Sequence, residues 1–256
     1  MPDAPTDVPA ELVHLDVVDG LATITLDSPH NRNALSRRLV AELAAHLDTV
    51  AGDPAVLVVR IRSSGRVFCS GADLSEATAD GMQEGARAIV SLQRQIAALG
   101  QPVVLELLGA VRAGGIGIVA AADIVVAADD ASFALTEVKL ALAPAIISLT
   151  VLPRLTSRAA AYTCLTGEVF TGAEAVGLGL VTRSVPAEGL TAEVERVCAS
   201  LATGAAQGLR ETKALLNRRL LAGIDADGEA LAALSARLFA SEEATAAMTA
   251  FLARGR

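Results

Sequence analysis

The sequence predicts a mixed α/β protein whose first half alternates strands with helices and whose second half is helical. In the first half, short β-branched runs alternate with segments of helical periodicity, which indicates a partly parallel sheet covered by helices. From Ser148 onward the periodicity is almost entirely helical. Apolar residues make up 52% of the 256 residues and charged residues only 20%, so a large core is expected, with further apolar surface between subunits.

The N-terminal elements are predicted to be a hairpin followed by a helix. Residues 12–18 and 21–26 alternate partly between apolar and polar side chains, and the Asp-Gly pair between them is a strong hairpin signal. A polar turn follows the hairpin. Asn33 is expected to cap the next helix, because helical periodicity begins at Ala34.

The remaining elements follow from the same two periodicities. The mixed half is expected to contain strands at 55–61, 103–108 and 124–127, and helices at 81–99 and 114–122. The helical half is expected to contain helices at 151–165, 172–177, 187–202, 205–221 and 227–254. A hinge expected around 184–189 divides the chain into a core of residues 1–185 and a helical region of residues 186–256.

Charge and cysteine content exclude several classes of protein. The formal net charge is −8 and the pI is about 4.9, which argues against a general nucleic-acid binder, since such proteins need a basic face. The most apolar segment, 102–128, is interrupted by charged residues and four glycines, so it predicts buried strands and a helix and not a membrane span. The cysteines are too far apart for a disulfide framework or a metal knuckle and fit a reducing cytoplasm: Cys69, Cys164 and Cys198.

Two glycine-containing turns could present backbone N–H groups to a ligand. In the stretch from Ser70 to Leu74, Gly71 lets the backbone turn, so the N–H of Ala72 could point into a cavity; an ordinary strand-to-helix turn is the alternative. The second turn opens a short helix at Gly114, whose free N–H groups could hold a developing oxyanion or could simply allow close packing. A dinucleotide loop is a weaker alternative, because that helix has only about two turns.

Glu137 is a lone carboxylate among apolar residues. Burial would raise its pKa and suit it to proton transfer near neutral pH, although a glutamate at a helix start could equally contact free N–H groups. Glu106 lies on the predicted strand before the second turn, and its facing does not follow from the pattern. His30 and Arg32 lie in the turn after the hairpin, where they could contact a phosphate or solvent.

Taken in order, these stretches resemble the crotonase family, also called the enoyl-CoA hydratase/isomerase superfamily. The resemblance spans residues 12–256 and rests on Asn33-Ala34-Leu35, Ser70-Gly71-Ala72-Asp73-Leu74, Gly114-Gly115, Ala122-Asp123-Ile124, and Thr136-Glu137-Val138 with Pro144. It implies a spiral of strand–strand–helix (ββα) units with a helical C-terminal trimerisation region. It also implies an acyl-CoA substrate and no separate cofactor, because coenzyme A is part of the substrate.

The resemblance further implies roles for individual residues. The N–H groups of Ala72 and Gly114 would form an oxyanion hole, and Glu137 would transfer the proton. The basic end of the chain, Arg254 and Arg256, is similar to the segment that reaches a neighbouring subunit's ligand. Coenzyme A would be contacted by residues of the two N-terminal turns: Arg32, Ser70, Ala72, Asp73 and Leu74.

The chain departs from typical hydratases of this family at one position. Those enzymes carry two catalytic glutamates, of which the second matches Glu137 and the first falls at Gly117, in the expected substrate site. The combination of Gly117 with 136–138 and 144–148 is similar to a bacterial subgroup that includes hydratases resembling methylglutaconyl-CoA hydratase. Such substrates carry a free carboxylate, which Arg112 could bind; a structural salt bridge is the alternative for Arg112.

The resemblance therefore predicts an enzyme that adds water across the α,β double bond of an enoyl-CoA thioester. Three alternatives stay open: a Δ3-Δ2-enoyl-CoA isomerase, which needs only one base; an acyl-CoA decarboxylase; and a catalytically inactive acyl-CoA-binding homologue. The protein is expected to be a cytoplasmic homotrimer or dimer of trimers, with no nucleic-acid or membrane partner.

Overall fold

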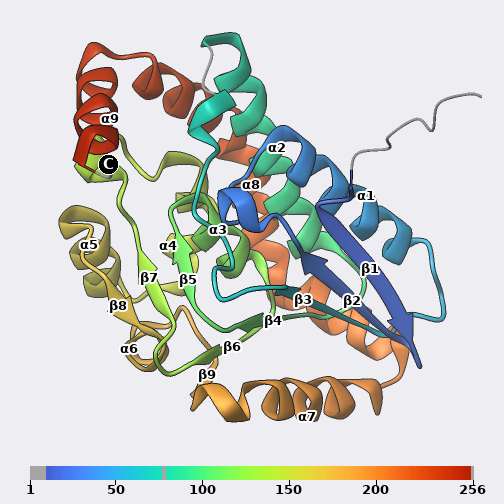
Figure 1. Cartoon of the computed structure of the whole chain (residues 1–256). Coiled ribbons are helices and arrows are strands. Elements are labelled where there is room, and N and C mark those ends of the chain that lie inside the picture. Colours follow the sequence, from blue (N-terminus) through green and yellow to red (C-terminus); the bar gives the residue numbers. More distant parts are fainter. Residues whose placement is uncertain (1–9, 77–78, 255–256) are drawn as a thin grey trace, which may run out of the picture.

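The computed structural model describes residues 10–76 and 79–254, which form two sheets enclosed by helices (Figure 1). The first two strands of the larger sheet form the antiparallel hairpin predicted around the Asp-Gly pair, and every later strand joins in parallel. The larger sheet runs in the order β1 (Val13–Val18), β2 (Leu21–Leu26), β3 (Val58–Ser63), β4 (Val103–Leu107), β6 (Ile124–Ala128) and β9 (Arg183–Val185).

A smaller sheet runs beside the larger one. It contains β5 (Ala110–Arg112), β7 (Ser132–Ala134) and β8 (Phe170–Thr171). Isolated parallel bridges extend it by two chain segments, through Cys69 to Val111 and through Leu35 to Ala72. Successive turns of the chain therefore place one segment in each sheet and then form a helix, so the predicted spiral of ββα units is confirmed.

Helices cover both faces of the larger sheet. In Figure 1, α1 packs on β1 and β2, whereas α7 crosses β3, β4 and β6 from the opposite side. The α-helices are α1 (Arg37–Ala51), α2 (Ala79–Ala98), α3 (Gly114–Ala121), α4 (Ala145–Arg154), α5 (Ser157–Thr166), α6 (Gly172–Leu178), α7 (Leu190–Ala202), α8 (Ala206–Phe239) and α9 (Glu242–Arg254). Short 3-10 helices are η1 (Pro29–Asn31), η2 (Leu74–Glu76), η3 (Glu137–Leu140) and η4 (Ala187–Gly189).

Several local expectations were wrong. The first long helix begins at Arg37 with Ser36 as its cap, because Asn33 has a left-handed φ of 53° and uses its side chain to bond Ser28 N and Val67 O. Helix α8 runs unbroken through the gap expected at 222–226, whereas the helices expected at 151–165 and 227–254 are interrupted at 155–156 and 240–241. The short strands β5, β7, β8 and β9 were not expected at all.

The boundary expected at residue 185 coincides with the end of β9. Beyond it, α7 contributes Leu190, Val194 and Val197 to the main apolar core, and α8 packs against α2 and α4. The helical region is therefore in close contact with the spiral. Among the helices of residues 10–76 and 79–254, none is long and apolar enough to cross a membrane.

Candidate active site

The two predicted N–H donors lie on neighbouring segments of the smaller sheet. Cys69 pairs in parallel with Val111, so three residues further along the same register Ala72 lies beside Gly114. A Cβ atom placed on Gly114 would lie 4.0 Å from the backbone nitrogen of Ala72. The pairing of the smaller sheet thus brings together two turns that are separated by about forty residues of chain.

Within residues 10–76 and 79–254, neither of these two N–H groups donates a hydrogen bond. Gly71 has φ +102° and accepts a 2.8 Å hydrogen bond from Leu35 N, which turns the chain and leaves the Ala72 N–H without an acceptor among the described residues. Gly114 is the first residue of α3, where an N–H has no partner within its own helix. Two adjacent free donors at a buried turn can hold a developing negative charge on an oxygen atom.

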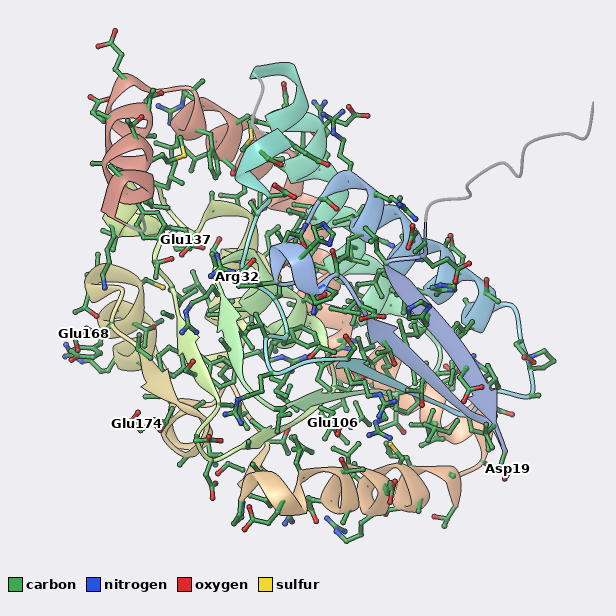
Figure 2. All side chains as sticks on the ribbon, viewed as in Figure 1. Asp19, Arg32, Glu106, Glu137, Glu168 and Glu174 are labelled. Atoms are coloured by element: carbon green, nitrogen blue, oxygen red, sulfur yellow. The ribbon has the colours of Figure 1, made fainter. Side chains whose placement is uncertain are left out.

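Glu137 begins η3, three residues after the end of β7. Because β5 and β7 pair in parallel with Arg112 opposite Ala134, the chain leaves both strands at one edge of the smaller sheet, with Gly114 two residues and Glu137 three residues past the last pair. Its side chain is only 9% exposed, and its Oε2 atom is buried without a hydrogen-bond partner. Burial raises the pKa of Glu137 from 4.5 to about 7. Figure 2 shows it on the side of the molecule where α9 packs on η3.

Gly117 stands where typical hydratases of the resembled family have their other glutamate. A Cβ atom at Gly117 would lie 2.6 Å from Cγ2 of Ile147 and 3.1 Å from Oε1 of Gln93. Thr150 reinforces this packing, since its hydroxyl lies 2.7 Å from Gln93 Oε1 and 3.0 Å from Gly117 O. Ile147 of α4 and Gln93 of α2 therefore fill the space that a side chain at position 117 would need.

A small pocket of about 70 Å³ opens beside Ala72. One face of α2 forms its longest wall, and the starts of α1 and α4 and the end of α8 close it. Its lining is mostly apolar, which suits an acyl chain. The residues that line it are Leu35, Arg37, Val40, Ala72, Asp73, Glu76, Gly81, Met82, Gly85, Ala86, Ala88, Ile89, Ile146, Ser235 and Phe239.

The residues expected to contact coenzyme A meet at one junction. Ser70 N donates to Arg32 O at 3.1 Å, and Asn31 donates to the Asp73 carboxylate at 3.2 Å. Hydrogen bonds from Ser75 lower the pKa of Asp73. The guanidinium of Arg32 is exposed and forms no ion pair with the described residues. Leu74 begins η2 beside them.

Arg112 is tied to the neighbouring strand. Its guanidinium donates to Val111 O at 2.9 Å, to Ser132 O at 2.6 Å and to Ser132 Oγ at 3.0 Å. Burial lowers its pKa. These bonds join β5 to β7, and no ion pair of Arg112 occurs among the described residues. At the other end of the chain, Arg254 closes α9 and Arg256 lies outside the described residues.

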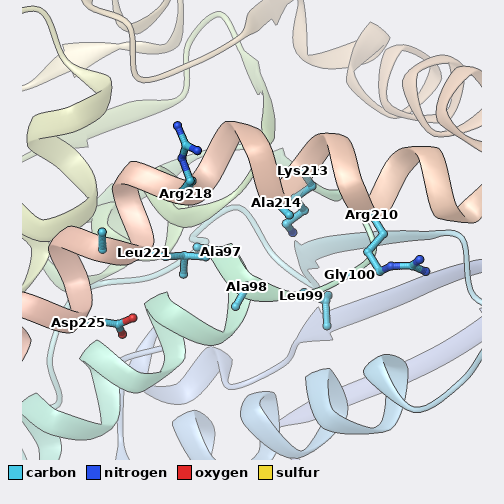
Figure 3. A pocket seen from close by; sticks show the side chains of 11 residues that line it. Ala97, Ala98, Leu99, Gly100, Arg210, Lys213, Ala214, Arg218, Leu221 and Asp225 are labelled. Carbon is cyan, nitrogen blue, oxygen red and sulfur yellow. The ribbon is translucent and has the colours of Figure 1, made fainter.

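A larger cavity of about 350 Å³ lies elsewhere, between the end of α2 and α8 (Figure 3). Its most buried charge is Lys213, which forms an ion pair with Asp123 at 2.8 Å and donates to Ile96 O and Gln101 O. Lys213 is therefore fully engaged in joining α8 to the core. The smaller pocket adjoins Ala72, one of the two predicted N–H donors, whereas the larger cavity is lined by neither donor nor Glu137, so the smaller pocket is the better candidate site.

Comparison with known proteins gives a consistent result. Residues 16–256 match the family model described as enoyl-CoA hydratase/isomerase. A solved structure of an enoyl-CoA hydratase from Mycobacterium avium is 44% identical, with a TM-score of 0.90, over 96% of this chain and 98% of that one. A Bacillus subtilis protein named "Probable enoyl-CoA hydratase" is 31% identical over 94% of this chain and 95% of its own length. Methylmalonyl-CoA decarboxylase shares the fold, at 19% identity and a TM-score of 0.82.

Proposed function

Given that this chain belongs to the enoyl-CoA hydratase/isomerase family, we propose that it is an enoyl-CoA hydratase that works with one carboxylate. The thioester oxygen binds between the N–H groups of Ala72 and Gly114. These donors stabilise the enolate oxygen as water adds across the α,β double bond, each by about 3–4 kcal/mol at the transition state. The required coenzyme A enters as part of the substrate, with Arg32, Ser70, Ala72, Asp73 and Leu74 as its proposed contacts.

Glu137 performs both proton transfers in this proposal. In its ionised form it accepts a proton from the attacking water, and in its protonated form it delivers a proton to the carbon next to the thioester carbonyl. A pKa of about 7 keeps both forms populated at neutral pH. Proton transfer of this kind contributes roughly 10²- to 10⁴-fold to the rate. The observation that carries the proposal is the buried, unpartnered Oε2 atom of Glu137, on the segment that leaves the smaller sheet at the same edge as Gly114.

A Δ3-Δ2-enoyl-CoA isomerase is the second candidate, and the packing at Gly117 favours it. Ile147 and Gln93 occupy the place of the other glutamate, which in two-acid hydratases helps to orient water. Moving a proton between two carbons of the acyl chain requires one base and no water. Decarboxylation has less support, because the Arg112 donors that would hold a substrate carboxylate are engaged by Ser132 and Val111.

Steady-state assays with three substrates separate these activities. Crotonyl-CoA reports hydration, a Δ3-enoyl-CoA reports isomerisation, and methylglutaconyl-CoA tests the substrate class of the resembled subgroup. Hydration of crotonyl-CoA or methylglutaconyl-CoA that exceeds the Δ3-enoyl-CoA reaction supports the hydratase. A faster Δ3-enoyl-CoA reaction replaces it with the isomerase. Binding of acetyl-CoA without turnover of any substrate would leave only an inactive acyl-CoA-binding homologue.

We also propose a cytoplasmic homotrimer or dimer of trimers. Large apolar side chains are exposed on two helical surfaces, with Tyr162 and Leu165 on α5 and Leu215 and Leu216 on α8 each more than half exposed. Such side chains on a helical surface support contacts between subunits. Sedimentation should give a mass of three or six times 26.1 kDa. A Leu165→Glu variant tests the surface on α5, and a wild-type monomer would contradict the proposal.

A further inference from the structure

The pocket beside Ala72 contains a hydroxyl group that the protein does not satisfy. Ser235 on α8 is 6% exposed and lines this pocket. Within the described part of the chain its hydroxyl has no hydrogen-bond partner. It does not donate to the carbonyl of the preceding helical turn, as the hydroxyls of Thr245 and Thr249 do in α9. Unlike the sealed Oε2 atom of Glu137, this oxygen keeps some exposure, so an atom of a ligand in the pocket can reach it.

The packing of α8 on α2 fixes where Ser235 lies in the pocket. The two helices run antiparallel, as the ion pairs Arg94–Asp225 and Arg87–Glu229 show. Continued toward the end of α8, this pairing brings Ser235 to the first turn of α2, where Met82 lines the same pocket. An acyl chain whose thioester oxygen is held at Ala72 can therefore extend along α2 toward the Ser235 hydroxyl.

The charges around the pocket exclude an anionic tail. Arg37 lies 3.5 Å from Glu76, and the Glu76 carboxylate also accepts the Arg37 backbone N–H at 2.9 Å, so these two charges offset each other. Asp73 lines the pocket as well, and hydrogen bonds from Ser75 stabilise its ionised form. The lining is thus net negative, which opposes a second carboxylate.

We infer that the Ser235 hydroxyl selects the substrate by hydrogen bonding to a neutral oxygen, a hydroxyl or a carbonyl, on the tail of the acyl group. This inference deepens the proposed function and rests on its assignment of the thioester to Ala72. It makes Ser235 a specificity-determining residue, because an alkyl tail that fills the pocket displaces water from the hydroxyl and leaves it unpaired, whereas an oxygenated tail satisfies it.

Binding measurements test this without requiring turnover. Calorimetry would compare plain butanoyl-, hexanoyl- and octanoyl-CoA with their ω-hydroxy and ω-oxo counterparts and with the ω-carboxylates of the same lengths. At one chain length, the neutral oxygen should tighten binding to the wild type by about 2- to 10-fold relative to the alkyl ligand. Ser235→Ala should abolish that preference and leave the alkyl ligand unaffected, and the carboxylate should bind less tightly than the neutral ligands.

Two control variants isolate the hydroxyl. Ser200→Ala removes an exposed serine on α7 and should keep the preference, and Ser235→Thr keeps a hydroxyl if Ser235→Ala fails to fold. Equal binding of alkyl and oxygenated ligands by the wild type at every length would overturn the inference, as would a preference that survives Ser235→Ala. Failure of the proposed hydratase activity would instead appear as absent turnover, with these binding differences still measurable.

Discussion

Glu106 and Glu137 are buried to the same degree, with 8% and 9% exposure, but they lie on different sides of the molecule and have different surroundings (Figure 2). Glu106 on β4 accepts two hydrogen bonds from Arg60 of the neighbouring β3, one of them at 2.6 Å, and a third from Thr191 of α7 at 2.9 Å. Glu137 has an oxygen with no hydrogen-bond partner in the described part of the chain. Equal burial thus has different consequences, since a paired carboxylate serves the fold and an unpaired one is free to exchange a proton.

The two environments also explain why Glu106 is unsuitable as the catalytic acid. Its position on the strand before the turn at Gly114 made it a possible proton carrier from sequence. The structure directs it to the face covered by α7, with both oxygens engaged. A group that must accept and release a proton needs an oxygen within reach of the substrate. Glu137 is therefore the only one of the two that fits this requirement.

The largest expected effect is on turnover, from Glu137→Gln. The amide keeps the shape of the side chain but cannot exchange the proton, so kcat should fall by roughly 10²- to 10⁴-fold. The affinity for coenzyme A should hardly change, because its proposed contacts lie around Ser70 and Asp73. Steady-state kinetics and calorimetry with acetyl-CoA measure the two effects. Wild-type turnover in a folded Glu137→Gln protein would remove this residue from the mechanism.

Glu106→Gln should have the opposite profile. The change leaves the buried Arg60 charge without its counter-ion, which lowers the free energy of unfolding by about 3–5 kcal/mol. The kcat per folded molecule should stay close to that of the wild type. Urea denaturation and active-site-normalised kinetics together check this. A large loss of kcat with unchanged stability would mean that the two carboxylates have been assigned to the wrong roles.

A pH dependence of stability should distinguish the same pair. Because burial raises the folded-state pKa of Glu137 from 4.5 to about 7, the folded state binds the proton more tightly than the unfolded state. Its stabilising contribution is complete below pH 4.5 and is lost as the pH rises to about 7. Glu137→Gln should therefore gain stability relative to the wild type as the pH rises through this window. Denaturation series at several pH values measure the difference, and parallel curves would contradict it.

The sequence allowed much of this to be predicted where the signals are local. The Asp-Gly hairpin and the long amphipathic helices follow from patterns within a few residues. The three-residue strands β5 and β7 carry no such pattern, because they are defined by pairing with each other, more than twenty residues apart. They are nonetheless the elements that bring Gly114 and Glu137 to one edge.

The site shows the same division. Ala72, Gly114 and Glu137 were identified by resemblance of short motifs, and the structure places them on adjoining segments. Ser235 was missed, because its place at the pocket depends on how α8 packs against α2. Ile147 entered only as part of the stretch 144–148, and its packing on Gly117 depends on how α4 packs against α3. An isolated serine in a long helix has no sequence signal that separates it from an ordinary core residue.

The smallest expected effect concerns the position where a second acid is absent. Gly117→Ala would place a Cβ atom 2.6 Å from Ile147 Cγ2, so it should lower the free energy of unfolding by about 1–3 kcal/mol through overpacking. Ile147→Ala alone should also destabilise, by leaving a cavity. Because the two changes complement each other in volume, the double variant should be more stable than the sum of the single effects predicts, with a coupling of about 0.5–3 kcal/mol in a double-mutant cycle. Additive effects would mean that Ile147 does not fill the space at Gly117.

With the coupling established, Gly117→Glu combined with Ile147→Ala would test whether a second acid can be accommodated there. If the site is limited by its single carboxylate, the added acid should raise the hydration of crotonyl-CoA above isomerisation.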